Sequence, residues 1–475
     1  MIRTARHVLL ALVLMAAAAA CGQKPGVSAQ AVNAGGGTGG TGTGATGTGA
    51  TARTGAGATP AGTGGGTVAG GTGATGDAGA SGGAAGDAGA AAGDAGATGG
   101  AAGPAGPGDR TGITDSEIVI GIHAPVTGAA PIPQNSFDAG KDIYFQFVNE
   151  TKGGIHNRKV RVVFRNDEFN PQTAVRVCKE MVEQEKAFLL VGGGGSDQIG
   201  ACARYAAGAG VPYLSAGVQE AGLSDLTNYF ALAMTYSQQS PLLADLVAKQ
   251  YAGKSVALLV ADNSSLDDYF ASQLAALQAR GINPSPAKRI PKTTSQTDAL
   301  SIATEIRDKD VVVWNASPVS LINVAQATAG QGGNPIYVGP GLTNGLNTVA
   351  EVGCPGVAGA TFFSPFPQLD VIDQMDPDFR PAYEKYAGKA PDDLGIALWG
   401  LDKLIAAGFE LAGPDMSRQS FISTLEQGQP LQTGVFPPVQ YQGSHFGGTA
   451  VHVLQADCSS SPGKYKTIGQ NVSAF

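Results

Sequence analysis

The chain has 475 residues, of which 71 are glycine and only 14% are charged. Its formal net charge is −8 and it contains no cluster of basic residues, which argues against a nucleic-acid-binding protein. The length would allow two or three domains, but the glycines are concentrated near the N-terminus, so only part of the chain is expected to be globular.

The first 20 residues have the pattern of an export signal. Arg3 and Arg6 precede an apolar run, Val8 to Ala20, that is too short for a permanent membrane span. The run ends Ala-Ala-Ala-Cys-Gly, which resembles a lipobox, the bacterial signal whose cysteine is diacylated and becomes the mature N-terminus. This resemblance predicts a signal peptide over 1–20 and a lipid anchor at Cys21, on the outer face of the bacterial plasma membrane. An ordinary signal peptide with an incidental cysteine is the alternative.

Residues 21–109 are predicted to form a disordered linker. Glycine, alanine and threonine dominate, GDAGA repeats begin at Gly76, Gly86 and Gly93, and no apolar face recurs. A literal GxSxG, Gly79 to Gly83, has neither a strand before it nor a helix after it, so it does not indicate a hydrolase. The linker would tether the globular part to the membrane.

The globular part, 110–475, begins with alternating strand-like and helix-like segments. Four strands and three helices are predicted in the order βαβαβαβ, which is typical of a doubly wound parallel sheet. The strands are expected over Glu117–His123, Val160–Arg165, Phe188–Val191 and Val211–Leu214, and the helices over Asn135–Glu150, Pro171–Glu185 and Asp197–Ala209.

A second series of the same kind follows, which implies a second α/β lobe. Its strands are predicted over Ser255–Ala261, Val311–Trp314, Ile336–Val338 and Gly359–Phe363, and its helices over Pro241–Gln250, Leu266–Arg280, Ala299–Asp308 and Leu321–Ala329. A final helix, Leu394–Leu411, is too apolar to lie on the surface. The fold class is therefore α/β, with two doubly wound parallel-sheet lobes.

The turn Gly192–Gly195 is the strongest candidate for a binding site. It follows a buried strand and precedes Ser196 and Asp197, a helix N-cap signal. Such a turn lies at the carboxyl edge of a parallel sheet, where glycine lets a ligand approach and the first N–H groups of the helix favour an anion. A glycine-capped turn that binds nothing is the alternative.

Four cysteines remain once Cys21 is acylated, and an even number in an exported chain fits two disulfides. Cys178 and Cys202 lie in the helices on either side of the glycine turn, and Cys354 with Cys458 follows by exclusion. A metal site is the rival interpretation, but the cysteines are far apart and there is no CxxC.

Motifs for catalysis and cofactors are missing from the sequence. There is no GxGxxG around Gly192–Gly200, and the Gly253-Lys254-Ser255 triplet precedes its strand, whereas a phosphate loop follows one. The histidines have no paired spacing, and no serine stands in a nucleophile elbow. We therefore expect no enzyme, no cofactor and no metal.

The order of the elements resembles the periplasmic branched-chain amino-acid-binding family, the type I solute-binding proteins of ATP-driven (ABC) importers. The resemblance is carried, in order, by Val119-Ile120-Gly121 with Pro125 and Thr127-Gly128, Asn149 to Gly154, Val162 to Phe164 with Asn166-Asp167, Asn170 to Ala174, Gly210-Val211-Pro212 with Ser215, and Leu398 to Glu410. It implies two lobes joined by three crossings: about 115–235 with 362–438, and about 236–361 with 439–475.

The resemblance also implies ligand contacts. The family's carboxylate-binding positions fall on Ser196 and on the turn with Ser215, Gly217 and Gln219. Gly341 stands where family members that bind amino acids carry an acidic residue for the ligand's ammonium. Asp197, Glu220 or Asp267 could replace that charge, and an amide ligand could instead pair with Asn263 and Asn315.

The expected partners are a small molecule, an ABC permease in the membrane and, through the lipid anchor, the membrane itself, with the protein acting as a monomer. A sensory ectodomain for a membrane receptor is the first rival interpretation, and a secreted hydrolase is the second. The sequence leaves the ligand and the particular permease open.

Overall fold

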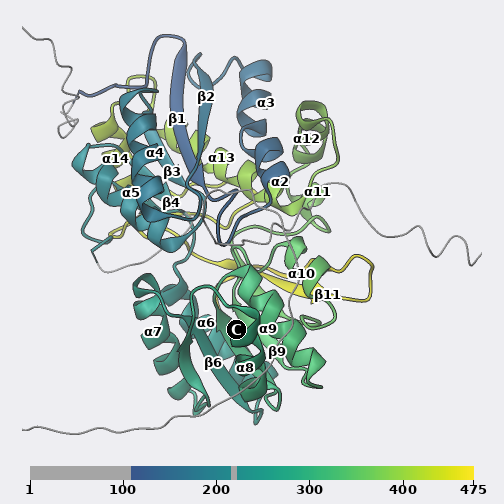
Figure 1. Ribbon diagram of the computed structural model, residues 1–475. Coiled ribbons are helices and arrows are strands. Elements are labelled where there is room, and N and C mark those ends of the chain that lie inside the picture. The colour runs from purple at the N-terminus through teal and green to yellow at the C-terminus, as the bar shows by residue number, and fades with distance from the viewer. Residues whose placement is uncertain (1–107, 216–221) are drawn as a thin grey trace, which may run out of the picture. The chain divides into compact units, whose positions relative to one another are not determined.

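The computed structural model describes residues 108–215 and 222–475, which form two α/β lobes, each built on its own sheet (Figure 1). The expected signal peptide, Cys21, nearly all of the linker, Gly217, Gln219 and Glu220 lie outside the described residues. No helix among the described residues combines the length and the apolar character that a membrane span requires.

The sheet of lobe 1 is parallel and has the strand order β2-β1-β3-β4-β5. Successive residues of β1 alternate between its two faces, because Ile118 and Ile120 enter one core cluster and Val119 enters another. The strands are β1 (Glu117–Ala124), β2 (Lys159–Asn166), β3 (Leu189–Gly192), β4 (Tyr213–Ser215) and β5 (Tyr229–Ala231).

Helices cover both faces of this sheet, so it is buried on both sides (Figure 1). One face is covered by α4 (Pro171–Glu183) and α5 (Ser196–Gly208). The other face carries α2 (Gln134–Gly140), α3 (Ile143–Thr151), α11 (Ile372–Met375), α12 (Phe379–Ala387), α13 (Asp393–Ala412) and α14 (Arg418–Glu426).

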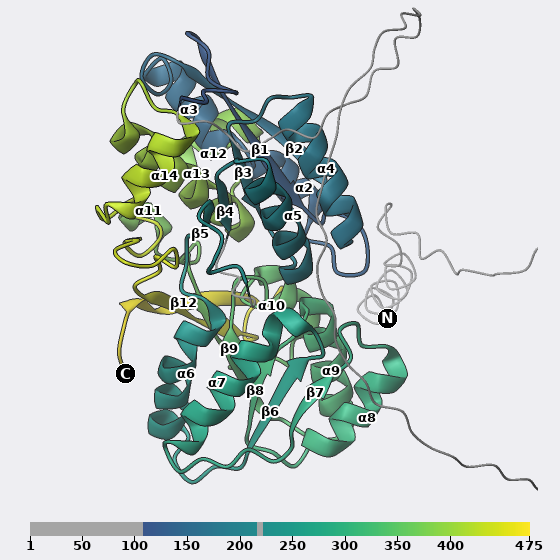
Figure 2. The ribbon, with the colours of Figure 1, turned by 90° about the vertical axis from the view of Figure 1, so that its left-hand side faces the viewer.

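The sheet of lobe 2 has the order β12-β11-β10-β9-β8-β6-β7 and is parallel except for β11, which is antiparallel to both of its neighbours. Figure 2 shows α6 and α7 on one side of it and α8 and α9 on the other. The strands are β6 (Val256–Ala261), β7 (Ala287–Ile290), β8 (Val311–Asn315), β9 (Ile336–Pro340), β10 (Thr361–Ser364), β11 (Val451–Asp457) and β12 (Lys464–Val472). The helices are α6 (Tyr236–Gln250), η1 (Ser264–Leu266), α7 (Asp267–Gln278), α8 (Gln296–Ile306), α9 (Pro318–Gly330) and α10 (Asn347–Gly353).

The chain passes between the two sheets three times: after β5, after β10 and after α14. Lobe 1 is thus completed by α11 to α14, and lobe 2 by β11 and β12. Two doubly wound α/β lobes were predicted from the sequence, and this fold class is confirmed.

The fold differs from the prediction in one helix that is split, in four strands, and in the helices α10, α11, α12 and α14, which were not predicted. The segment Asn135–Glu150 forms two helices, because Asp142 has φ −146° and interrupts the helical backbone. Gly140, just before the break, packs closely on α13, where a Cβ would lie 3.0 Å from Leu398 Cδ1. The strands β5, β7, β11 and β12 were not predicted, β5 because it is only 3 residues long and β7 because its sequence is Ala-Lys-Arg-Ile.

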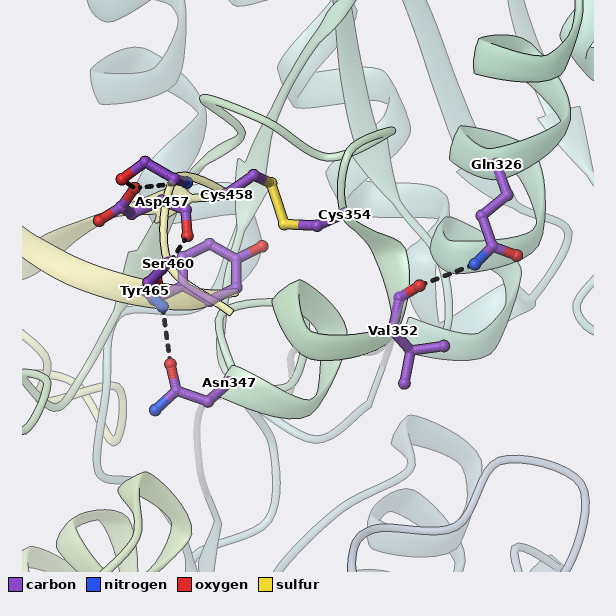
Figure 3. The surroundings of a disulfide bond; sticks show 9 residues. Gln326, Asn347, Val352, Cys354, Asp457, Cys458, Ser460 and Tyr465 are labelled. Atoms are coloured by element: carbon purple, nitrogen blue, oxygen red, sulfur yellow. Dashed lines mark hydrogen bonds between the residues drawn. A yellow bond between two sulfur atoms is a disulfide. The ribbon is translucent and has the colours of Figure 1, made fainter. Parts of the chain in front are cut away.

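Both expected disulfides form. Cys178 of α4 is bonded to Cys202 of α5, so this bond joins the two helices on one face of the first sheet. Cys354 is bonded to Cys458, which ties the end of α10 to the β11–β12 turn (Figure 3). Next to it, Asn347 accepts a hydrogen bond of 2.7 Å from the Tyr465 N–H and holds α10 against β12.

Candidate functional site: a cavity between the two lobes

A cavity of about 130 Å³ lies between the lobes, at the carboxyl ends of strands from both sheets. In each sheet the strand order reverses direction at one point: between β1 and β3 in lobe 1, and between β6 and β8 in lobe 2. Ligands of open α/β sheets bind at such a switch point. Here the two switch points face the same cavity, which is lined by residues at the ends of these strands or just after them: Pro125, Gly194 to Ser196, Asn263, and Asn315 to Pro318.

The first wall of the cavity is the start of α5. Ser196 is its first residue, and the N-cap is Gly195 with φ +78°, not Ser196 as the sequence suggested. No side chain caps this helix end, so the first N–H groups of α5 are left for another partner. Ser196 lines the cavity and lies at the N-terminal end of the helix, which is the end that favours an anion.

A buried polar network supports the loop beside α5. Asp167 accepts a 3.0 Å hydrogen bond from the Phe169 N–H through one oxygen and lies 2.8 Å from His123 Nδ1 through the other. His123 Nε2 lies 2.6 Å from the Tyr213 hydroxyl. Asp167, His123 and Tyr213 are fully buried, and their network fixes the turn that places Phe169 (φ +55°) on the cavity wall.

Three asparagines of lobe 2 line the cavity. The Asn263 side chain accepts hydrogen bonds from the Ser265 N–H (2.9 Å) and hydroxyl (2.7 Å) and so caps η1. Asn344 donates to the Ala316 carbonyl at 3.1 Å. Among the described residues, the Asn315 side-chain nitrogen and the Asn344 side-chain oxygen are buried without a hydrogen-bond partner. Buried polar atoms are normally paired, so these two atoms suit a polar ligand.

Lys292, from the loop after β7, is the one charged residue among the described residues that line the cavity. Its ammonium pairs with Asp197 of α5 and lies 5.2 Å from the centre of the Phe169 ring. Asp197 Oδ1 also lies 3.1 Å from the Ser265 hydroxyl of lobe 2, which shares its single proton between this oxygen and the Asn263 side chain. These contacts connect the two lobes beside the cavity.

Lys292 was not predicted as a site residue because β7 was not predicted as a strand. Without that strand, Lys292 had no place at the carboxyl edge of the sheet. Phe169 and Asn344 were not predicted as site residues either. Both lie within four residues of the end of a strand, and this position in the sequence could have identified them.

The structure does not bring every candidate residue to the cavity. Asp267 is exposed and pairs with Arg289 at 2.8 Å. Ser215 is fully buried, and its hydroxyl lies 2.5 Å from the Tyr229 hydroxyl. Gly341 lies between the lining residues Pro340 and Leu342 but does not line the cavity itself. Ser196, Asn263 and Asn315 do line it, and Asp197 reaches its edge through Lys292.

One group of possible metal ligands occurs within the described ranges: His123 with Cys178 and Cys202. The two sulfurs are bonded to each other, which leaves the histidine without thiolate partners.

Two lobes that meet over a cavity, with three connections between them, define a two-lobed binding protein. The chain belongs to the periplasmic binding protein family, whose model matches residues 117–462. This is a family of solute-binding proteins and not of enzymes.

The similarity to an individual relative covers only part of the chain. A protein of Pseudomonas aeruginosa described as an amino acid binding protein is 28% identical over 149 residues, which is 30% of this chain and 39% of that protein. The match therefore spans about two fifths of the relative's length.

Solved structures are similar over most of the chain. A solute-binding protein of an ABC transporter from Rhodopseudomonas palustris, in complex with 3,4-dihydroxybenzoic acid, has a TM-score of 0.63 and 17% identity and covers 76% of this chain and 98% of its own. A substrate-binding protein from Desulfitobacterium hafniense in complex with Leu has a TM-score of 0.59 and 17% identity and covers 74% and 100%. At these identities the likeness establishes the fold.

Proposed function

We propose that this protein is an extracytoplasmic solute-binding lipoprotein that captures a small carboxylate, such as an amino acid or a related acid, between its two lobes and delivers it to an ABC importer. The observation that carries the proposal is the cavity of about 130 Å³ onto which the switch points of both sheets open. Ligand binding there contacts both lobes and favours their closed arrangement.

The residues that line the cavity favour an organic acid as the ligand. The uncapped start of α5 and the Ser196 hydroxyl suit a carboxylate, while Ile132, Ile199 and Leu266 provide an apolar wall. The volume of about 130 Å³ is close to that of an engineered cavity of about 150 Å³ that binds benzene. The ligand should therefore have one small apolar body and one charged end.

A thermal-shift screen of the purified protein against small carboxylates, amino acids and amides tests the binding function. A ligand at about 100 times its Kd stabilises the folded state by roughly 2.7 kcal/mol, which raises the melting temperature measurably. Failure of every solute to stabilise the protein would contradict the proposal.

Transport and anchoring need separate tests. Deleting the gene should abolish uptake of the solute found in the screen, and the Cys21→Ser variant should appear in the medium or remain an uncleaved precursor. A Cys21→Ser protein that stays on the membrane at its mature size would disprove the lipid anchor.

A further inference from the structure

The charge that the described residues present to the cavity is positive. Of the described residues that line it, Lys292 alone is charged, and no carboxylate is among them. Two of the three acidic residues proposed to hold an ammonium are engaged in other pairs, Asp267 with Arg289 and Asp197 with Lys292, while Glu220 lies outside the described residues. A ligand ammonium would thus face a lysine.

Lys292 has the capacity to bind a second anion. An ammonium group carries three N–H donors, and Asp197 is its one hydrogen-bond acceptor among the described residues. Both partners are partly exposed, and ion pairs of this kind contribute little to stability, so sharing the lysine between Asp197 and a ligand costs little. The Phe169 ring keeps the ammonium at the cavity wall.

A second observation indicates a ligand at the same place. Asn315, which is 5% exposed and lines the cavity, has a side-chain nitrogen without a partner. A carboxylate in the cavity would supply the missing acceptor. The positive end of α5, the Lys292 ammonium and the Asn315 amide are then three donors from two lobes around one anion.

We propose that the cavity is specific for a small apolar carboxylate without an ammonium group, and that Lys292 recognises its negative charge while it keeps its contact with Asp197. This inference rests on the proposed solute-binding function and names its ligand class. Lys292 thereby selects acids over the amino acids and amides of the same carbon skeleton.

The test compares matched probes by calorimetric titration of the purified full chain. One series is 4-methylpentanoate, its amide and leucine, and the other is phenylacetate, phenylacetamide and phenylglycine. At least one acid should bind ten times or more tighter than both its amide and its amino acid. Lys292→Gln should weaken acid binding tenfold or more and leave amide binding unchanged, while Lys292→Arg, which keeps the charge, should restore acid binding to within a few-fold.

The control is Lys288→Gln, since Lys288 pairs with Glu305 on the surface and does not line the cavity. It should leave acid binding unchanged. An amino acid that binds more tightly than its acid, an acid affinity that ignores Lys292→Gln in a folded protein, or no binding of any probe would each overturn the inference. The first two results leave the solute-binding function intact, whereas the absence of binding by every solute of a broad panel would contradict that function too.

Discussion

Gly341 and Phe362 lie so close together that no side chain fits between them. A Cβ on Gly341 would stand 2.5 Å from the Phe362 Cβ and 3.0 Å from the Phe363 carbonyl oxygen. Both neighbours belong to β10, which runs parallel to β9. The packing of the sheet therefore leaves no room at Gly341 for the acidic residue that the family resemblance led us to expect there.

This packing predicts the result of introducing a carboxylate at Gly341. Gly341→Asp should lower the free energy of unfolding by about 1 to 3 kcal/mol, the usual cost of overpacking, and should not create an amino-acid site. Chemical denaturation measures the loss. Gly330→Ala is the control, since a Cβ there meets nothing within 4 Å. A stable Gly341→Asp protein that binds leucine would show that the site can accept the charge.

Ser196→Ala should weaken binding of the true ligand roughly tenfold to a hundredfold. Hydrogen bonds to a charged group contribute about 1.5 to 3 kcal/mol, and 1.4 kcal/mol is about a factor of ten in affinity. Because the N-cap is Gly195, the variant should keep the stability of the wild type to within about 0.5 kcal/mol.

Calorimetric titration and thermal melts of the same samples separate the two effects. Asp267→Asn is the matched control, because Asp267 is exposed and outside the cavity, and it should change neither quantity. Unchanged affinity in a folded Ser196→Ala protein would exclude the start of α5 as the binding site.

The sequence was sufficient for the fold wherever an apolar run marked a buried strand, as in Val256–Ala261 and Val311–Asn315. It failed for β7, whose Lys288 and Arg289 interrupt the apolar pattern, and so it could not place Lys292. Ser196 could be predicted as a site residue because the end of the buried strand and the glycines that follow it are visible in the local sequence. Asp267 was misjudged because its pairing with Arg289 depends on β7, a strand 20 residues further along the chain.

The two disulfides should differ in their contribution to stability. They close loops with sequence separations of 24 and 104 residues, and the chain-entropy model gives about 3.5 and about 4.7 kcal/mol, respectively. Replacing Cys354 and Cys458 by alanine should therefore lower the free energy of unfolding more than replacing Cys178 and Cys202. Denaturation curves of the two double variants measure which disulfide contributes more to stability. Free thiols at all four positions of the wild type would show that neither bond forms.

Asp393 should make stability depend on pH. Burial at the start of α13 raises its pKa from 3.8 to about 6, against the effect of the Asn347 N–H, which donates to it at 2.6 Å. The protonated form is favoured by folding, so its contribution is complete below pH 4 and is lost as the pH rises through 6. At about 1.4 kcal/mol per pKa unit the loss is roughly 3 kcal/mol.

The Asp393→Asn variant cannot ionise and should gain stability relative to the wild type between pH 4 and pH 6. Melting curves at intervals of pH measure the difference, with Asp378→Asn as a control substitution of the same kind at an exposed position. A difference that does not change with pH would mean that Asp393 has no raised pKa in the folded protein.

Filling the cavity between the lobes tests most directly whether the ligand binds there. Thr343 lines the cavity and is only partly buried, so Thr343→Trp should fill it and leave the lobes folded. Calorimetric titration of the solute identified by the thermal-shift screen should give one site per chain in the wild type and at least a hundredfold loss of affinity in Thr343→Trp. Equal affinity in the two proteins would place the ligand elsewhere and would show that this cavity is not the binding site.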